Sequence, residues 1–306
     1  MDNWKALFVL GLIFLLFSFS CKNAEVQQES GPQLDFYHSV HGQGHGPPII
    51  VIHGGPGLGS TYMESHLMGL SRDHELIFYD QVNSGRSQMT QDPARVSLAS
   101  FLADIDNLRK HYGHQKVSLL AHSWGGLLAM KYATKYPERV DKLILVNSIS
   151  ADSKVNGQVN TRVANLFSAD DLEARTIVMR SEAFRTGKSE AYEELMNIGF
   201  AYQFSDRNLI RSLQLGLPDD FESKSRLLTG LYEDLTDYNF TEEIKTIACP
   251  TFLLYGIDDP GTPLNISALS AAIPNAEMKV IDYAGHFPFI EQPLVTMDAI
   301  RSFIKS

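Results

Sequence analysis

The sequence is short of cysteine, of clustered positive charge and of long apolar segments. Its 306 residues include two cysteines, Cys21 and Cys249, so the fold must rely on an apolar core rather than on cross-links. Cys249, at the start of an apolar run, is expected to be a buried structural thiol. Lys and Arg number 26 against 36 Asp and Glu, and no basic tract could follow a phosphate backbone. Nucleic acid is therefore not expected as a partner.

The apolar segment at residues 6–19 is too short for a comfortable membrane span. It follows Lys5 and ends in small residues around Cys21, which is typical of an export signal. The segment resembles a bacterial lipoprotein signal, although Ser18 stands where that pattern usually has Leu. We expect residues 1–21 to be a signal peptide and Cys21 to carry a lipid anchor in the membrane of the cell envelope. An ordinary cleaved signal and an uncleaved anchor are the alternatives, and all three place the protein outside the cytoplasm.

Short apolar runs follow a polar segment that has no periodic pattern. The polar segment, residues 22–33, is expected to be a flexible tether outside the fold. Continuous apolar runs bounded by helical patterns are typical of parallel strands covered on both faces. The expected strands are 49–52, 76–79, 117–120, 143–146, 251–255 and 278–281.

Helical patterns separate several of these runs. Residues 98–111 and 125–136 have the spacing of amphipathic helices, and Pro137 ends the second. The alternation of strand and helix predicts an α/β fold with a mostly parallel, doubly wound sheet.

The alternation stops between residues 150 and 241. There, segments 171–184 and 190–204 have helical spacing with no strand pattern between them. We therefore expect a helical cap at 150–241, inserted between the two parts of one core, 34–149 and 242–306.

Ser123 has the surroundings of a nucleophile elbow. The sequence VSLLAHSWGG at 117–126 reads as a buried strand, a serine between small residues and the start of a helix. A tight turn of this kind brings Ala121 and Gly125 close together, so both must be small, and it pushes the serine outward. Alanine replaces the usual first glycine here. The alternative is an ordinary serine in a strand-to-helix turn.

A serine hydroxyl needs a base to take its proton, and the base needs an acceptor that fixes its tautomer. His286 follows the last expected strand and is the predicted base. Asp259 follows the strand at 251–255 and is the predicted acceptor, with adjacent Asp258 as the alternative. The order Ser, Asp, His suits a fold of this kind. His122 is expected to shape the turn rather than to transfer protons.

Hydrolysis also needs hydrogen-bond donors for the oxygen that becomes negative. The glycines of the sequence HGGPG at 53–57 let backbone amides approach a substrate, and we assign the Gly55 and Trp124 amides as the oxyanion pair. The cluster lacks the Lys-Ser/Thr ending of a phosphate loop. No metal or organic cofactor is expected, because His286 would activate Ser123 directly.

These motifs together resemble the proline iminopeptidase family of α/β-hydrolases, from about residue 48 to the C-terminus. The Gly-Gly-Pro-Gly loop followed by Asp-Gln is the more discriminating part, since the Ser-Asp-His spacing is shared across the superfamily. The residues that carry the resemblance are 53–57, 79–81 with 85–87, 104–109, 122–125, and 285–286 with Pro288 and Glu291.

The resemblance implies an α/β-hydrolase fold and a serine aminopeptidase that releases an N-terminal residue, with proline one candidate, from short peptides through an acyl-enzyme. Its partner would be a small peptide with a free N-terminus, whose ammonium needs a carboxylate. Glu233, in a segment that looks like the family's cap glutamate, is the candidate, and a solvated helix acid is the alternative. The chain departs from the family at Pro260, where some relatives have a second glutamate, and at residues 82–83.

A carboxylester or lactone hydrolase with the same Ser-His-Asp set is the alternative function, and it would be indifferent to a free amino group. A binding protein on a hydrolase scaffold would be expected to lose one of the three residues, and all three are present. Arg86 either pairs with Asp80 to brace its loop or faces the cleft. The sequence gives no expectation for the oligomeric state or the preferred side chain.

Overall fold

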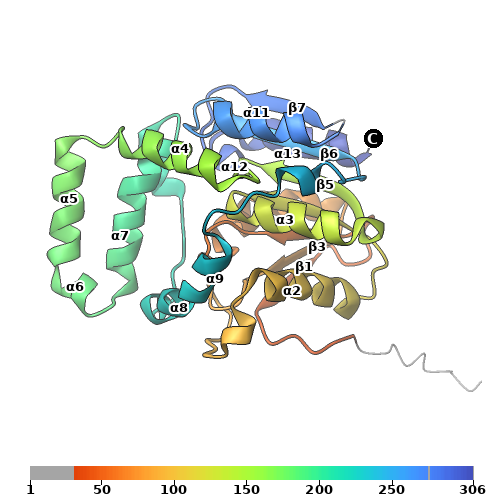
Figure 1. Cartoon of the computed structure of the whole chain (residues 1–306), viewed down its shortest axis with the longest axis horizontal. Coiled ribbons are helices and arrows are strands. Elements are labelled where there is room, and N and C mark those ends of the chain that lie inside the picture. Colours follow the sequence, from red (N-terminus) through yellow and green to blue (C-terminus); the bar gives the residue numbers. More distant parts are fainter. Residues whose placement is uncertain (1–30, 275, 306) are drawn as a thin grey trace, which may run out of the picture. The chain divides into compact units, whose positions relative to one another are not determined.

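A computed structural model describes residues 31–274 and 276–305. They contain a seven-stranded sheet in the order β1-β3-β2-β4-β5-β6-β7 (Figure 1). All neighbours pair in parallel except β1, which pairs antiparallel with β3. The strands are β1 (His38–His41), β2 (Ile49–Ile52), β3 (Leu76–Tyr79), β4 (Val117–His122), β5 (Val140–Val146), β6 (Thr251–Gly256) and β7 (Glu277–Ile281).

The predicted mostly parallel α/β sheet is confirmed, and every expected strand is present. Strand β1 was not predicted, because its four half-buried residues, HSVH, offer no apolar run. It is an edge strand whose partner residues run from His38 opposite Tyr79 to His41 opposite Leu76. An edge position needs little apolar surface, since one side of the strand has no neighbour.

Successive residues of each strand point to opposite faces of the sheet, and each face has its own core. Ile50 and Ile52 belong to the core that includes Leu127 of α3, whereas Ile49 and Val51 belong to the core that includes Ile300 of α13. The helices outside the cap are α1 (Thr61–Leu67), α2 (Leu98–His111), α3 (Trp124–Lys135), α10 (Thr241–Ile244), α11 (Thr262–Ala272), α12 (Pro288–Glu291) and α13 (Pro293–Lys305).

The segment 150–241, described throughout, forms helices and contributes no strand to the sheet. Its two ends meet in an antiparallel bridge between Asp152 and Asn239, where the Phe240 amide donates to the Ala151 carbonyl at 2.8 Å. In Figure 1, α5, α6 and α7 stand away from the sheet. The helices are α4 (Ser153–Ala164), α5 (Ala169–Arg180), α6 (Glu182–Arg185), α7 (Ser189–Phe200), α8 (Phe221–Leu227) and α9 (Thr229–Asp234).

The last helices of the insertion are fastened to the core. The buried Lys224 ammonium on α8 donates to the Gly85 carbonyl at 2.9 Å. Asp234, at the end of α9, accepts from the Leu98 amide at the start of α2 at 2.8 Å. These contacts hold α8 and α9 on the core while α5 to α7 project from it.

The expected signal peptide, Cys21 and most of the expected tether lie outside the described residues. In the described part of the chain, no helix has the length and apolar character that a membrane crossing requires. Cys249 is a free thiol, partly buried, and burial raises its pKa to about 11. A thiol with so high a pKa is unreactive at neutral pH, which agrees with a structural role.

Candidate active site

Ser123 lies in a strained turn between β4 and α3. Its φ of 54° and ψ of −122° are sparsely populated for a residue with a side chain, and such strain persists where the surroundings enforce it. The Ser123 amide donates to the Val146 carbonyl at 3.1 Å. A Cβ at Gly125 would lie 2.5 Å from the Ile52 carbonyl oxygen, so this position requires glycine. The local sequence therefore produces the sharp turn that an exposed nucleophile needs.

His286 and Asp259 form a buried pair. His286 Nδ1 lies 2.7 Å from Asp259 Oδ2. The same oxygen accepts from Asn147 Nδ2 at 2.7 Å, and Oδ1 accepts from the Gly261 amide at 2.9 Å. Burial alone would raise the pKa of Asp259, but His286 and the donors on Gly261 and Asn147 lower it below its usual value. The carboxylate is thus held ionised, facing one nitrogen of the imidazole.

Asp258, the alternative acceptor, is directed elsewhere. Its Oδ2 accepts from the Ser205 hydroxyl at 2.7 Å, and its amide donates to the Ala284 carbonyl. The structure therefore brings Asp259, rather than Asp258, to the imidazole of His286.

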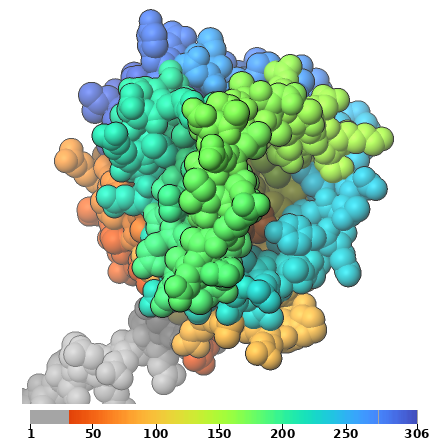
Figure 2. Space-filling view, turned by 90° about the vertical axis from the view of Figure 1, so that its left-hand side faces the viewer, coloured from red at the N-terminus to blue at the C-terminus, as the bar shows by residue number. Residues whose placement is uncertain are grey.

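Ser123 and His286 line one small cavity of about 50 Å³. Figure 2 shows the cap side of the molecule, which is hollowed between the green cap helices and a cyan segment from the end of the cap. No Asp or Glu is among the residues around this cavity in the described part of the chain. The lining residues are Gly54, Gly55, Leu58, Tyr62, His122, Ser123, Phe200, His286 and Phe287.

Gly55 and Trp124 follow two neighbouring strands, because β2 pairs with β4 and places Ile52 opposite Ala121. Within residues 31–274 and 276–305, neither the Gly55 amide nor the Trp124 amide donates to a protein acceptor. Gly55 has a φ of +130°, and a Cβ there would lie 2.8 Å from the Gly57 amide nitrogen. Both amides are therefore without a protein acceptor in the described part of the chain, and their role as an oxyanion pair stays a prediction.

Gln81 joins the glycine loop to the elbow. Its Nε2 donates to the His53 carbonyl at 2.9 Å, and its Oε1 accepts from the indole of Trp124 at 2.9 Å. Its amide also donates to His53 Nε2. Gln81 therefore links the residue that precedes the glycine loop to the side chain of the first residue of α3.

His122 is buried and its ring joins two loops of the site. The His286 carbonyl can only accept, so His122 Nε2 carries a proton and donates to it at 2.8 Å. In the neutral ring Nδ1 then has no proton, so it accepts from Tyr62 Oη at 2.7 Å, and that oxygen in turn accepts from the Gly54 amide. Burial, and secondarily His286, lower the pKa of His122 well below its usual value, so the ring is neutral. This geometry agrees with a shaping role.

Glu233 is exposed on α9 and does not line the Ser123 cavity. Two neighbours set the direction of this helix: Leu231 is buried, and the Asp234 carboxylate caps the start of α2. The structure thus does not bring Glu233 together with Ser123 and His286.

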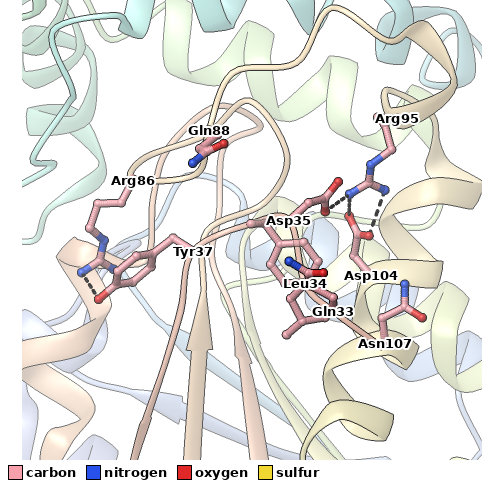
Figure 3. Close-up of a pocket in the computed structure, with 10 residues that line it drawn as sticks. Gln33, Leu34, Asp35, Tyr37, Arg86, Gln88, Arg95, Asp104 and Asn107 are labelled. Atoms are coloured by element: carbon pink, nitrogen blue, oxygen red, sulfur yellow. Dashed lines mark hydrogen bonds and ion pairs between the residues drawn. The ribbon is translucent and has the colours of Figure 1, made fainter. Parts of the chain in front are cut away.

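Arg86 braces its own loop. Its Nε donates to Asp80 Oδ2 at 2.9 Å, and its guanidinium lies 3.8 Å from the centre of the Tyr37 ring. Arg86 lines a different hollow of about 730 Å³, where Arg95, Asp35 and Asp104 lie at the other end (Figure 3). Of the two alternatives for Arg86, the structure supports the pairing with Asp80.

Asn147, Tyr62 and Glu291 contact the site and had no predicted part in its geometry. Asn147 follows β5, with a φ of 41°, and is buried against Asp259. A polar residue directly after a buried strand was the available signal for it, because the strands end at the same edge of the sheet. Tyr62 lies on α1 and carries no comparable signal, and Glu291 on α12 was named only among the residues of the family resemblance.

The chain matches the family described as the alpha/beta hydrolase fold over residues 47–293. It is 26% identical over 272 residues to a proline iminopeptidase of Lactobacillus helveticus, covering 84% of this chain and 89% of that one. Among solved structures it resembles the proline iminopeptidase of Mycobacterium smegmatis, with a TM-score of 0.65, 20% identity and coverage of 90% and 96%. It also resembles a thermophilic esterase from Thermogutta terrifontis, with a TM-score of 0.62, 22% identity and the same coverage.

The protein therefore belongs to the α/β-hydrolase family and is a hydrolase of that fold. The resemblance to the proline iminopeptidases that the motifs indicated is confirmed by the curated relatives. The solved structures support the fold, and identities of 20% and 22% do not assign a substrate.

Proposed function

We propose that the protein is an exported serine aminopeptidase that releases an N-terminal residue, with proline one candidate, from short peptides. The observation that carries the proposal is the Asp259–His286 pair, held at 2.7 Å beside a cavity that also contains Ser123. The curated relatives named as proline iminopeptidases support the choice of substrate class.

In the proposed reaction Ser123 Oγ attacks the carbonyl carbon of the first peptide bond while His286 takes its proton. The Gly55 and Trp124 amides hold the negative oxygen of the tetrahedral intermediate. The C–N bond then breaks, His286 protonates the leaving amine, and the N-terminal residue stays on Ser123 as an ester. Water, deprotonated by His286, attacks this ester and releases the free amino acid.

The Asp259 carboxylate contributes by stabilising the imidazolium that forms twice in this cycle. A cavity of about 50 Å³ beneath the cap suits a compact side chain at the bond to be cleaved. Burial of this kind also excludes water, which strengthens each hydrogen bond to the developing charge.

An ester or lactone hydrolase is the second candidate, and one observation favours it. An aminopeptidase should offer a carboxylate to the substrate ammonium, because an unpaired buried charge is costly. No Asp or Glu lines the cavity among the described residues, and Glu233 is exposed. The role proposed for Glu233 therefore rests on the resemblance alone.

Hydrolysis of amino-acid arylamides separates the two candidates. Prolyl and alanyl arylamides, their N-acetylated forms and simple aryl esters would be given to the wild type, with Ser123→Ala as the blank. An aminopeptidase should cleave the free-amine arylamides and spare the acetylated ones. Turnover of esters without turnover of arylamides would refute the peptidase and leave Ser123 as the nucleophile.

Glu233→Gln tests the ammonium partner in the same assay. If Glu233 binds the ammonium, KM for free-amine arylamides should rise about tenfold or more, as expected for a lost charge-assisted contact. Glu242→Gln, an exposed acid on α10, is the matched control. An unchanged KM in Glu233→Gln would remove this residue from the proposal.

A further inference from the structure

His286 is fixed at three points that come from three parts of the chain. Its ring contacts Asp259, which follows β6. Its carbonyl accepts from His122 Nε2 at 2.8 Å, at the end of β4. Its amide donates to the Gln203 carbonyl at 2.6 Å, and Gln203 belongs to the cap. The candidate base is therefore held in part by the insertion that covers it.

The cap segment at 203–205, here called the strap, crosses directly over the loop that carries His286. A Cβ on Gly285 would lie 2.0 Å from the Gln203 carbonyl oxygen, so this approach requires glycine. Phe204 stacks on Phe287 with ring centres 5.0 Å apart. Since Phe287 also lines the Ser123 cavity, the strap packs behind one wall of the site.

One buried carboxylate fastens the strap to the loop of His286. Glu291 is 8% exposed, its Oε2 accepts from the Gly285 amide at 2.6 Å, and its Oε1 accepts from the Ser205 amide at 2.7 Å. Each oxygen thus serves one backbone segment, and the two segments are joined through the one side chain. The Ser205 hydroxyl adds a contact to Asp258, beside Asp259.

We propose that Glu291 is a positioning residue for His286, acting by clamping the strap of the cap onto the loop of the base. The inference rests on the proposed chemistry of Ser123 and His286, and it does not depend on which substrate is cleaved. It assigns the cap a second task besides covering the site: residues 203–205 hold the base in line with the nucleophile.

Glu291→Gln is the sharpest perturbation, because it keeps the shape and changes one oxygen to an NH₂ group. One of the two backbone amides then faces a donor in place of an acceptor. The loop of His286 loses a fixed point, while Ser123, Asp259 and the cavity lining are unchanged. Small displacements of a catalytic group reduce rates steeply, by about a hundredfold for an error of about 1 Å.

The rate at which an alkyl fluorophosphonate labels Ser123 measures this directly. Ser123 Oγ forms a bond to phosphorus, fluoride leaves, and the proton of the hydroxyl goes to His286. We expect Glu291→Gln to be labelled about ten- to a hundredfold more slowly than the wild type. Glu291→Asp, which keeps both acceptor oxygens, should recover part of the rate.

Two controls separate positioning from general damage. Glu138→Gln makes the same change at an exposed carboxylate that pairs with Arg139, and should leave the labelling rate unchanged. Circular dichroism at the assay temperature should show Glu291→Gln fully folded. With any ester or arylamide that the wild type cleaves, kcat should fall in Glu291→Gln while KM stays within about twofold, because the substrate contacts are intact.

Labelling of folded Glu291→Gln at the wild-type rate would overturn the inference and leave the proposed function standing. A loss of rate no larger than the loss of folded protein would overturn it as well. Absence of labelling in the wild type would instead refute Ser123 as an activated nucleophile, and the inference with it.

Discussion

Replacement of the buried imidazole at position 122 should change how stability depends on pH. His122 is 1% exposed and burial holds its pKa well below the ordinary 6.5. In the unfolded chain the same ring is solvated and takes up a proton as the pH falls through 6.5. The unfolded state then binds more protons than the folded state, so the free energy of unfolding decreases with falling pH in this window.

The size of the effect follows from linkage. A neutral ring whose unfolded form titrates near 6.5 destabilises the fold by about 1.4 kcal/mol at pH 5.5 and by close to zero at pH 7.5. His122→Gln removes this contribution and keeps the neighbouring His286, Asp259 and His53. The variant should be less stable than the wild type at both pH values. Its free energy of unfolding should nevertheless decrease by about 1.4 kcal/mol less than that of the wild type when the pH falls from 7.5 to 5.5.

Urea unfolding followed by fluorescence at pH 7.5, 6.5 and 5.5 measures the difference. The same replacement at exposed His45 is the matched control for the substitution itself. Parallel curves for His122→Gln and the wild type would show that this ring takes up a proton in the fold as readily as in the unfolded chain, and the proposed neutral ring with Nδ1 as an acceptor would be wrong.

Asp259→Asn should lower kcat by about 10⁴-fold, since an amide favours the wrong tautomer of the base. Asp258→Asn should change kcat little, and similar losses in both variants would refute the assignment of Asp259. Gly126→Ala should destabilise the fold by about 1–3 kcal/mol, because the new Cβ would lie 2.0 Å from Ser148 Oγ, and adding Ser148→Gly should restore most of the loss in thermal unfolding. Cys21→Ser should abolish incorporation of labelled fatty acid in a bacterial host; a labelled variant would remove Cys21 as the lipid site.

The sequence predicted most of the sheet because buried parallel strands appear as continuous apolar runs, whereas β7, expected to be covered on both faces, is exposed at its first four residues. The run at β4 and the small residues after it placed Ser123 correctly in a sharp turn. Strand β1 was not predicted, since a half-buried edge strand needs no apolar run.

The candidate site was predictable only as far as chain order allows. Spacing could not separate Asp258 from Asp259; the donors on Asn147 and Gly261 make that choice in three dimensions. Glu233 was named from resemblance, and the packing of α9 turns it outward. Contacts such as Glu291 with Ser205 depend on where the cap returns across the core, which no local pattern encodes.

The ends of the insertion meet at Asp152 and Asn239, which makes the cap resemble an interchangeable module with a single seam. That simple picture is incomplete, because Lys224 and Asp234 also fasten the cap to the core. The Gln203 carbonyl and the clamp at Glu291 attach it in addition to the loop of His286. A chimera that receives a foreign cap at the seam would lose the support of His286 along with the old specificity. Domain exchange in this scaffold, in the laboratory or in evolution, should therefore succeed where residues 203–205 are carried over with the core.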